Sequence, residues 1–334
     1  MYWLIIGIVF IISILLTGLI RVYAIRRNLL DVPNRRSSHT VPTPRGGGLS
    51  IVIVCLVSIM LLVVDKQLST SWGLVTMLAL AWVALTGFLD DHRHIAARWR
   101  LLSQFAASIL LVYWMGGLPE IKVMSYVINL GFFGDILLVI GLVWLINLFN
   151  FMDGIDGIAC IETLSSSFIV GLIFIFIFDS SGLATLNIIV GASTAGFLYW
   201  NFPPAKIFLG DVGSGFLGLM LGALMLASTY VIPQMFWVWL ILLGVFIVDA
   251  TYTLLSRLLR GEKVYHAHCS HAYQCAARRY DSHLTISLSV LLINVLWLAP
   301  WAVSVALAWV DGITAIFITY IPLVVLARYF SAGK

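Results

Sequence analysis

Residues 73–94 read GLVTMLALAWVALTGFLDDHRH, an apolar run that ends on two adjacent carboxylates, Asp90 and Asp91. The run is apolar on every face and long enough to cross a bilayer as a helix. A β-barrel would instead show alternating segments of about ten residues. Of the 334 residues, 61% are hydrophobic and only 10% are charged. The sequence therefore predicts an all-α, polytopic integral membrane protein.

Similar apolar blocks recur along the whole chain and define its organisation. About eleven blocks have the length of a membrane span. They cover residues 2–20, 49–64, 73–89, 101–115, 135–151, 158–178, 184–200, 214–231, 235–256, 284–308 and 313–328. We interpret residues 1–334 as a single membrane-embedded domain, because the sequence shows no internal repeat and no low-complexity tract. Residues 1–20 lack a basic leading segment, so we expect an uncleaved anchor.

The distribution of basic residues predicts the orientation, because short cytoplasmic loops are rich in Lys and Arg. Placing residues 21–48 in the cytoplasm puts 17 of the 19 Lys and Arg residues on that side, and only Lys66 and Lys122 outside. The N-terminus is then external and the C-terminus cytoplasmic. The net charge of +4 is therefore a signal of topology, and no nucleic-acid partner is expected.

The acidic residues gather on the same predicted side, at or just beyond helix ends. These residues are Asp90, Asp91, Asp153, Asp156, Asp211, Glu262 and Asp281. The main acidic candidate inside a span is Asp249, near the inner end of its block. A transporter of a charged solute, the alternative function, would carry ionisable groups near the membrane midplane. A cluster at one interface instead predicts a site open to the cytosol on one side and to lipid on the other.

The pair Asp90 and Asp91 has two explanations. Neighbouring carboxylates repel each other unless a cation bridges them or one stays protonated, which favours a functional site. Helix capping is the alternative, because an Asp at a helix N-terminus offsets the helix dipole. A cap uses one side chain, so it explains a pair less well.

Two further segments combine polar residues with glycines. In INLFNFMDGIDG the polar residues recur every third position, which places them on one helical face. They are Asn147, Asn150, Asp153 and Asp156, and their spacing is not that of an EF-hand. In NFPPAKIFLGDVGSG a glycine-rich turn surrounds Asp211 before a new span. Such a turn binds anions and the carboxylate suits a metal, although the Walker pattern is absent.

The fourth segment, YHAHCSHAYQCAARR, combines histidines with arginines. Its residues are His266, His268, His271, Arg278 and Arg279, which suit phosphate oxygens and sugar hydroxyls. A zinc site with Cys269 or Cys275 is one alternative, but the spacing is not a familiar one. A solvated basic loop next to the membrane is the other.

Together the four segments resemble the polyprenyl-phosphate N-acetylhexosamine-1-phosphate transferases, bacterial glycosyltransferase family 4. This family includes phospho-N-acetylmuramoyl-pentapeptide transferase and the enzymes that initiate O-antigen, enterobacterial common antigen and teichoic acid synthesis. The resemblance starts at DVPNRRSSHTVPTPRGGG, residues 31–48, and continues in order through the histidine segment. It therefore covers most of the chain.

The resemblance implies roles for individual residues. The implied catalytic residues are Asp90, Asp91, Asp156 and His268. The implied substrate-binding residues are Arg100, Asn147, Asn150, Asp153, Asn201, Phe208, His266, His271 and Arg278, with Phe208 stacking on uracil and Asn201 near the base. Asp211 and Asp91 are the implied ligands of Mg²⁺, with Mn²⁺ as an alternative. The chain departs from many relatives at Arg100, where they have Lys, and an Arg presents a rigid fork rather than a point charge.

The implied reaction takes place at the cytoplasmic face of the bacterial inner membrane. Undecaprenyl phosphate attacks the β-phosphorus of a UDP-HexNAc and yields undecaprenyl-diphosphate-sugar and UMP, which starts O-antigen and lipopolysaccharide or another cell-envelope glycan. The resemblance also allows a homodimer in the lipid bilayer. Electrostatics and positioning would supply most of the catalysis. A phosphomonoester has a second pKa of about 6, which weakens the case for Asp90 as a general base.

The SHAYQ stretch at residues 270–274 resembles the subgroup that uses 6-deoxy sugars. Ala272 and Tyr273 would then offer apolar contact to a C6 methyl group. We therefore expect a donor such as UDP-N-acetylfucosamine or UDP-N-acetylquinovosamine. An apolar pocket rejects an added hydroxyl by only about a hundredfold, so the preference would be limited.

Overall fold

The computed structural model describes residues 2–33, 41–124, 126–178, 180–262 and 269–334. This part of the chain is almost entirely helical, which confirms the all-α prediction. The helices are α1 (Tyr2–Arg26), α2 (Leu49–Val64), α3 (Thr70–His92), α4 (Ala97–Met115), α5 (Gly131–Met152), α6 (Ile158–Ile173), α7 (Ser181–Asn201), α8 (Gly210–Val231), α9 (Met235–Leu242), α10 (Gly244–Leu259), α11 (Ala272–Tyr280), α12 (His283–Leu292), α13 (Ala299–Ala306) and α14 (Gly312–Tyr329). Two π-helical stretches, η1 (Phe174–Phe178) and η2 (Ile293–Leu298), continue α6 and α12.

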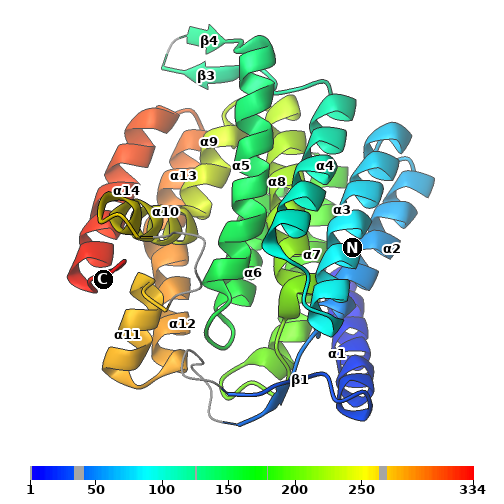
Figure 1. The fold of residues 1–334 in the computed structure, drawn as a ribbon. Helices are drawn as coiled ribbons and strands as arrows, with labels where there is room; N and C mark the ends of the chain where they lie inside the picture. The colour runs from blue at the N-terminus through cyan, green and yellow to red at the C-terminus, as the bar shows by residue number, and fades with distance from the viewer. Residues whose placement is uncertain (1, 34–40, 125, 179, 263–268) are drawn as a thin grey trace.

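Two small antiparallel hairpins complete the described structure. One pairs β1 (Leu30–Asp31) with β2 (Thr43–Pro44), and the other pairs β3 (Ile121–Val123) with β4 (Tyr126–Ile128). The β3–β4 hairpin lies at one end of the helices, and β1 lies at the opposite end (Figure 1). The strands are connections at the two ends of a helical bundle.

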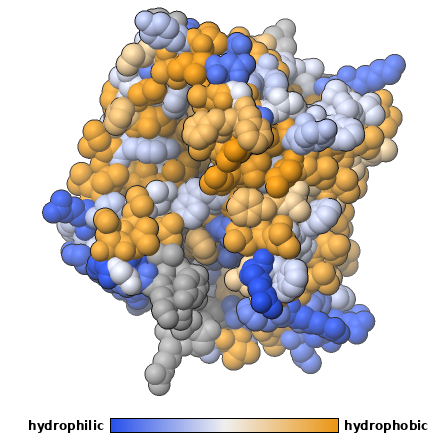
Figure 2. Space-filling view, turned by 45° about the horizontal axis from the view of Figure 1, so that its top comes forward, coloured by the Kyte–Doolittle hydropathy of each residue, from blue (hydrophilic) through white to orange (hydrophobic). Residues whose placement is uncertain are grey.

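Each apolar block expected from the sequence contains a helix. In the described part of the chain, eight helices are long and apolar enough to cross a membrane. The shorter α2 has 16 residues, and α4 carries Arg98 and Arg100 near its start. Figure 2 shows a surface dominated by apolar side chains, as expected for a bundle that faces lipid.

The block at residues 235–256 differs from the expected single span. It forms two helices, α9 and α10, that are bent by 68° relative to each other at a break between Leu242 and Gly244. In Figure 1, α10 is seen almost end-on, whereas α9 runs along the bundle. Hydropathy does not reveal the break, because the residues on both sides of it are apolar.

Helix α8 is the centre of the bundle and packs against α3 and α5. Close approach is possible because glycines lie at the contacts. A Cβ atom on Gly87 of α3 would collide with the backbone of Asp211, and a Cβ atom on Gly218 of α8 would collide with the backbone of α5. Small residues at such contacts allow helices to pack closely in a membrane. The packing brings the end of α3, with Asp90 and Asp91, to the start of α8.

The segments between helices gather the predicted site at one end of the bundle. The backbone carbonyl of Lys206 accepts a hydrogen bond from Arg21 Nε at 3.1 Å, and that of Asp91 accepts one from Arg45 Nη2 at 2.5 Å. Arg21 of α1, Arg45, the aspartate pair and the turn before α8 are therefore neighbours. Which side of the membrane this end faces remains a prediction from the basic residues.

Candidate active site

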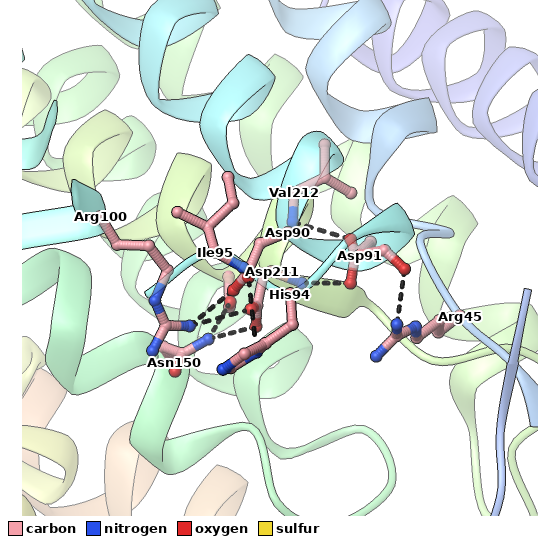
Figure 3. Close-up of polar contacts among 10 residues, drawn as sticks. Arg45, Asp90, Asp91, His94, Ile95, Arg100, Asn150, Asp211 and Val212 are labelled. Carbon is pink, nitrogen blue, oxygen red and sulfur yellow. Dashed lines mark hydrogen bonds and ion pairs between the residues drawn. The ribbon is translucent and has the colours of Figure 1, made fainter. Parts of the chain in front are cut away.

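Asp90 lies in the last turn of α3 and is almost completely buried. Its Oδ1 accepts a hydrogen bond from the backbone N–H of Ile95 at 2.6 Å, and its Oδ2 pairs with Arg100 Nη1 at 2.7 Å (Figure 3). The imidazole of His94 lies farther away, 3.9 Å from Oδ1. Both oxygens of Asp90 thus have protein donors, and one of these donors carries a full positive charge.

Asp91 makes a different set of contacts. Its Oδ1 and Oδ2 accept hydrogen bonds from the backbone N–H groups of Asp211 and Val212, each at 3.1 Å. These N–H groups belong to the first turn of α8, so Asp91 caps a helix that is distant in sequence. A carboxylate at a helix N-terminus is favoured by the helix dipole. The geometry gives Asp91 a positioning role at the start of α8, and the metal ligation that the resemblance implied stays a prediction.

Asp211 is the accessible carboxylate of the cluster, with 34% of its side chain exposed. Its Oδ1 accepts a hydrogen bond from Asn150 Nδ2 at 2.6 Å, and its Oδ2 lies 3.3 Å from Arg100 Nη1. Arg100 therefore bridges Asp90 and Asp211. The preceding residue, Gly210, has φ +76°, a backbone conformation that favours glycine and turns the chain into α8.

The polar residues 147–156 do not all face this cluster. Asn150 does, but Asn147 Nδ2 donates to Gln104 Oε1 at 2.7 Å and to the Val143 carbonyl at 2.8 Å. Asp153 follows the end of α5 and interacts electrostatically with Asp211. Burial, followed by the charges of Asp211, Asp156 and Asp91, raises the pKa of Asp153 well above its usual value. The site therefore concentrates negative charge that Arg100 only partly balances.

Asp156 is held in the turn between α5 and α6 by groups on two other segments. Its Oδ2 accepts a hydrogen bond from the Ala205 N–H at 3.0 Å and lies 3.4 Å from His283 Nδ1. The Ser287 hydroxyl donates to its backbone carbonyl at 2.8 Å. Sequence analysis assigned no role to His283, which lies immediately before the predicted span 284–308.

The two residues predicted near the nucleobase lie on either side of the turn before α8. Asn201 is buried, and its Oδ1 accepts a hydrogen bond from the Gly157 N–H at 2.9 Å while its Nδ2 donates to the Ile207 carbonyl at 3.0 Å. This side chain joins the start of α6 to the turn. The side chain of Phe208 is half-buried, and its backbone pairs with Pro44 and Gly47. Of the two, Phe208 has the more accessible side chain.

The histidine segment is described only from residue 269 onward, so His266 and His268 lie outside the described residues. His271 is buried, with its ring stacked near those of Phe151 and Tyr273 and its Nδ1 3.4 Å from Asp249 Oδ1. Asp249 accepts hydrogen bonds from the backbone N–H groups of Ala272 and Tyr273 at 2.8 and 2.9 Å. Asp249 thus caps α11 as Asp91 caps α8.

Ala272 and Tyr273 are largely buried, and their contact with a sugar stays a prediction. Their exposures are 9% and 4%, and the Tyr273 hydroxyl donates to the Phe151 carbonyl at 2.8 Å. Both residues pack α11 against its neighbours, which is a tertiary arrangement that the sequence motif did not reveal. The exposed Arg278 donates to Cys275 Sγ at 3.3 Å, and its guanidinium lies at the surface of α11.

The donor groups of the cluster fit a magnesium ion that is shared with a substrate. Among the described residues, no three His, Cys, Asp or Glu side chains are arranged to hold a metal by themselves. Mg²⁺ is usually held by one or two carboxylates together with substrate phosphates, rather than by a complete protein cage. The partly exposed Asp211 offers carboxylate oxygens for such an ion, and Asp153 lies among further carboxylates that a cation would balance.

Known proteins resemble this chain over most of its length. Residues 71–229 match the model of glycosyl transferase family 4. The chain is 31% identical, over 298 residues, to a probable undecaprenyl-phosphate N-acetylglucosaminyl 1-phosphate transferase of Bacillus subtilis, covering 85% of this chain and 80% of the relative. The chain belongs to glycosyl transferase family 4.

Other similar proteins carry related names. This family 4 member is 29% identical to the phospho-N-acetylmuramoyl-pentapeptide-transferase of Streptococcus pneumoniae strain CGSP14 over 249 residues, 70% of this chain and 74% of the relative. It is 33% identical to the decaprenyl-phosphate N-acetylglucosaminephosphotransferase of Mycolicibacterium smegmatis over 236 residues, 64% of this chain and 56% of the relative. The family match contains Asp90, Arg100, Asn150 and Asp211, so the charged cluster lies inside the part of the chain that defines the family.

Proposed function

We propose that this protein transfers a HexNAc-1-phosphate group from a UDP-sugar to undecaprenyl phosphate at the cytoplasmic face of the inner membrane. The observation that carries the proposal is the cluster of Asp90, Arg100, Asn150 and Asp211 at one end of a lipid-facing bundle. At this end of the bundle, near the membrane surface, the charged headgroup of a lipid and a water-soluble nucleotide reach the same side chains. The names of the family 4 relatives support the two substrate classes.

In the proposed reaction, an oxygen of the lipid phosphate attacks the β-phosphorus of the UDP-sugar. A new P–O bond forms to the lipid phosphate, the P–O bond to the α-phosphate breaks, and UMP leaves with the electron pair. Mg²⁺ held by Asp211, with Asp153 as a second ligand, would neutralise charge on the diphosphate. Arg100 is placed to balance negative charge beside the same carboxylates. Positioning and electrostatics thus supply the catalysis.

The geometry favours a supporting role for Asp90. Its Oδ2 holds Arg100 at 2.7 Å and its Oδ1 accepts from a backbone N–H, so the carboxylate orients the guanidinium. A phosphomonoester with a second pKa of about 6 is already largely dianionic at neutral pH. The attack therefore needs no general base, and Asp90 acts as a positioning residue for Arg100 in this proposal.

The sugar is proposed only as an N-acetylhexosamine. Ala272 and Tyr273 pack α11 against its neighbours, so their burial does not add support for a 6-deoxy donor. The relatives quoted above are named for N-acetylglucosamine or N-acetylmuramoyl-pentapeptide substrates. The product, a lipid-linked sugar diphosphate, suits the first step of a cell-envelope glycan such as O-antigen.

The test uses purified protein, undecaprenyl phosphate, Mg²⁺ and a panel of β-³²P-labelled UDP-HexNAc donors that includes 6-hydroxy and 6-deoxy sugars. We expect radiolabel to enter the lipid fraction with release of one UMP per lipid product. Asp211→Asn keeps the shape of the side chain but loses its charge, so it should remain folded and lose nearly all turnover. Full wild-type activity in EDTA, full activity of Asp211→Asn, or no labelled lipid with any donor would contradict the proposal.

A further inference from the structure

Arg45 lies beside the carboxylate cluster, and the proposed reaction does not use it. It is half-buried and belongs to the segment between β2 and α2. Its Nη2 donates to the backbone carbonyl of Asp91 at 2.5 Å. Figure 3 shows Arg45 and Arg100 on opposite sides of the carboxylates. The cluster therefore has two cationic neighbours, of which only Arg100 has a role so far.

Backbone hydrogen bonds fix the position of Arg45. The N–H of Phe208 donates to the Pro44 carbonyl at 2.8 Å, and the Phe208 carbonyl accepts from the Gly47 N–H at 2.9 Å. Phe208 is three residues before Asp211. Arg45 is thus held between two anchored positions, next to the turn that carries Asp211.

The protein uses little of the guanidinium of Arg45. Among the described residues, Nη1 has no hydrogen-bond acceptor and is not buried, and Nε is buried without an acceptor. No described carboxylate forms an ion pair with Arg45, whereas Arg100 pairs with both Asp90 and Asp211. Arg45 acts on the Asp91 carboxylate only from beyond ion-pair distance. Its charge and an accessible N–H group are therefore available to another partner.

The proposed substrates have the chemistry that such a guanidinium binds. Both carry phosphate groups, and both must approach carboxylates that repel them. An arginine offers parallel N–H groups that match phosphate oxygens and keeps its charge at any physiological pH. Because Arg100 is already paired with two carboxylates, Arg45 is the cation with more free capacity for phosphate.

A purely structural role of Arg45 is the alternative. Asp91 lies in the last turn of α3, where carbonyls lack partners in the helix and a positive charge is favoured by the helix dipole. Arg45 satisfies one of these carbonyls through Nη2 alone. A cap of this kind predicts an effect on stability and none on the affinity for substrates.

We propose that Arg45 is a substrate-binding residue that holds phosphate oxygens on the side of the cluster opposite Arg100. The phosphate belongs either to the diphosphate of the UDP-sugar or to the lipid phosphate. The choice of these two ligands rests on the proposed function, but their binding can be measured without turnover.

The test is the binding of UDP and of undecaprenyl phosphate, each measured separately by native mass spectrometry of the full-length protein. Arg45→Gln keeps a donor for the Asp91 carbonyl and loses the charge. We expect the Kd of one ligand to rise about tenfold or more, and that of the other to stay within about threefold of wild type. The affected ligand identifies the source of the phosphate. Arg45→Lys keeps the charge without the planar fork, so it should weaken the same ligand by less.

Arg21 provides a matched control. It also donates to a backbone carbonyl, from Nε to that of Lys206 at 3.1 Å, but its guanidinium lies 5.8 Å from the centre of the Trp200 ring. Like Arg45, it forms no ion pair with a described carboxylate. Arg21→Gln should therefore leave both Kd values unchanged, although it removes the same charge from the same end of the bundle.

Several outcomes would overturn the proposal for Arg45. These are wild-type Kd values of Arg45→Gln for both ligands, with or without a lower Tm, an equal rise for both ligands, and no binding of either ligand to the wild type. If Arg45→Gln does not fold, wild-type affinity of Arg45→Lys for both ligands would overturn it as well.

A turnover assay separates this proposal from the proposed function. In Arg45→Gln, the KM of the substrate that binds more weakly should rise about tenfold or more, while the KM of the other substrate stays close to wild type. Absence of transferase activity in the wild type would contradict the proposed function only, because the Kd values would still decide the role of Arg45.

Discussion

Replacing Asp91 tests whether it is a cap of α8 or a metal ligand. Its two oxygens each accept a backbone N–H of α8, from Asp211 and Val212, at 3.1 Å. Hydrogen bonds to charged groups contribute about 1.5–3 kcal/mol, and a buried donor without a partner costs about 1–3 kcal/mol. Asp91→Asn retains one accepting oxygen, so we expect a loss of about 1–2 kcal/mol in stability. Asp91→Ala removes both acceptors and should cost about 3 kcal/mol.

The assay combines thermal unfolding in detergent with a magnesium titration of the remaining transferase activity. For a chain of this size, these losses correspond to a decrease in apparent Tm of about 2–4 °C. Because a cap positions Asp211 without touching the ion, the Mg²⁺ concentration for half-maximal activity should stay close to that of wild type. As a control, Asp65→Asn changes an exposed Asp whose side chain accepts from Gln67, and it should shift neither quantity.

The reasoning about Asp91 is refuted by the opposite pattern. If Asp91→Asn unfolds at the wild-type temperature but needs much more Mg²⁺, then Asp91 is a metal ligand and its contacts with α8 rearrange when substrates bind. Equal stability of Asp91→Asn and Asp91→Ala would also contradict the hydrogen-bond argument, because the structure predicts a graded loss.

Three other substitutions test the remaining parts of the site. Arg100 contacts both Asp90 and Asp211 with one nitrogen, Nη1, so Arg100→Lys keeps the charge but replaces the planar guanidinium that holds this nitrogen between the carboxylates by a flexible ammonium, and kcat/KM should fall about tenfold or more; wild-type kinetics would show that the guanidinium is dispensable. Because the pKa of Asp153 is raised in the folded protein, its carboxyl stays protonated there at pH values at which it is ionised in the unfolded chain. Asp153 therefore lowers the free energy of unfolding more and more as the pH rises above about 4. In EDTA, Asp153→Asn should therefore raise the Tm relative to wild type more at pH 8 than at pH 5, and an equal shift at both pH values would contradict this assignment. Gly87→Ala places a Cβ against the Asp211 backbone, so it should lower the Tm and the activity together, and a variant with normal stability would show that α3 and α8 can separate at no cost.

Much of the fold was predictable from the one-dimensional sequence. Every apolar block of span length is helical, although the block at 235–256 is divided into two helices, because lipid-embedded backbone must satisfy its own hydrogen bonds within a segment. The gathering of Asp90, Asp153, Asp156 and Asp211 at one end of the bundle also followed from their positions at block ends. These properties depend on local hydrophobicity and on the order of the blocks, and both can be read directly from the sequence.

The break at residue 243 and the role of each carboxylate were decided by tertiary structure. Asp90 and Asp91 are neighbours of the same type, yet one pairs with Arg100 and the other caps α8. Glu162 is buried in an apolar block, and its partner Asn294 belongs to a distant one. The physical reason is that a carboxylate takes its role from the donors that surround it. The donors of Asp90, Ile95 and Arg100, are close to it in the sequence, whereas the backbone N–H groups that Asp91 accepts belong to α8, which reaches α3 only through helix packing.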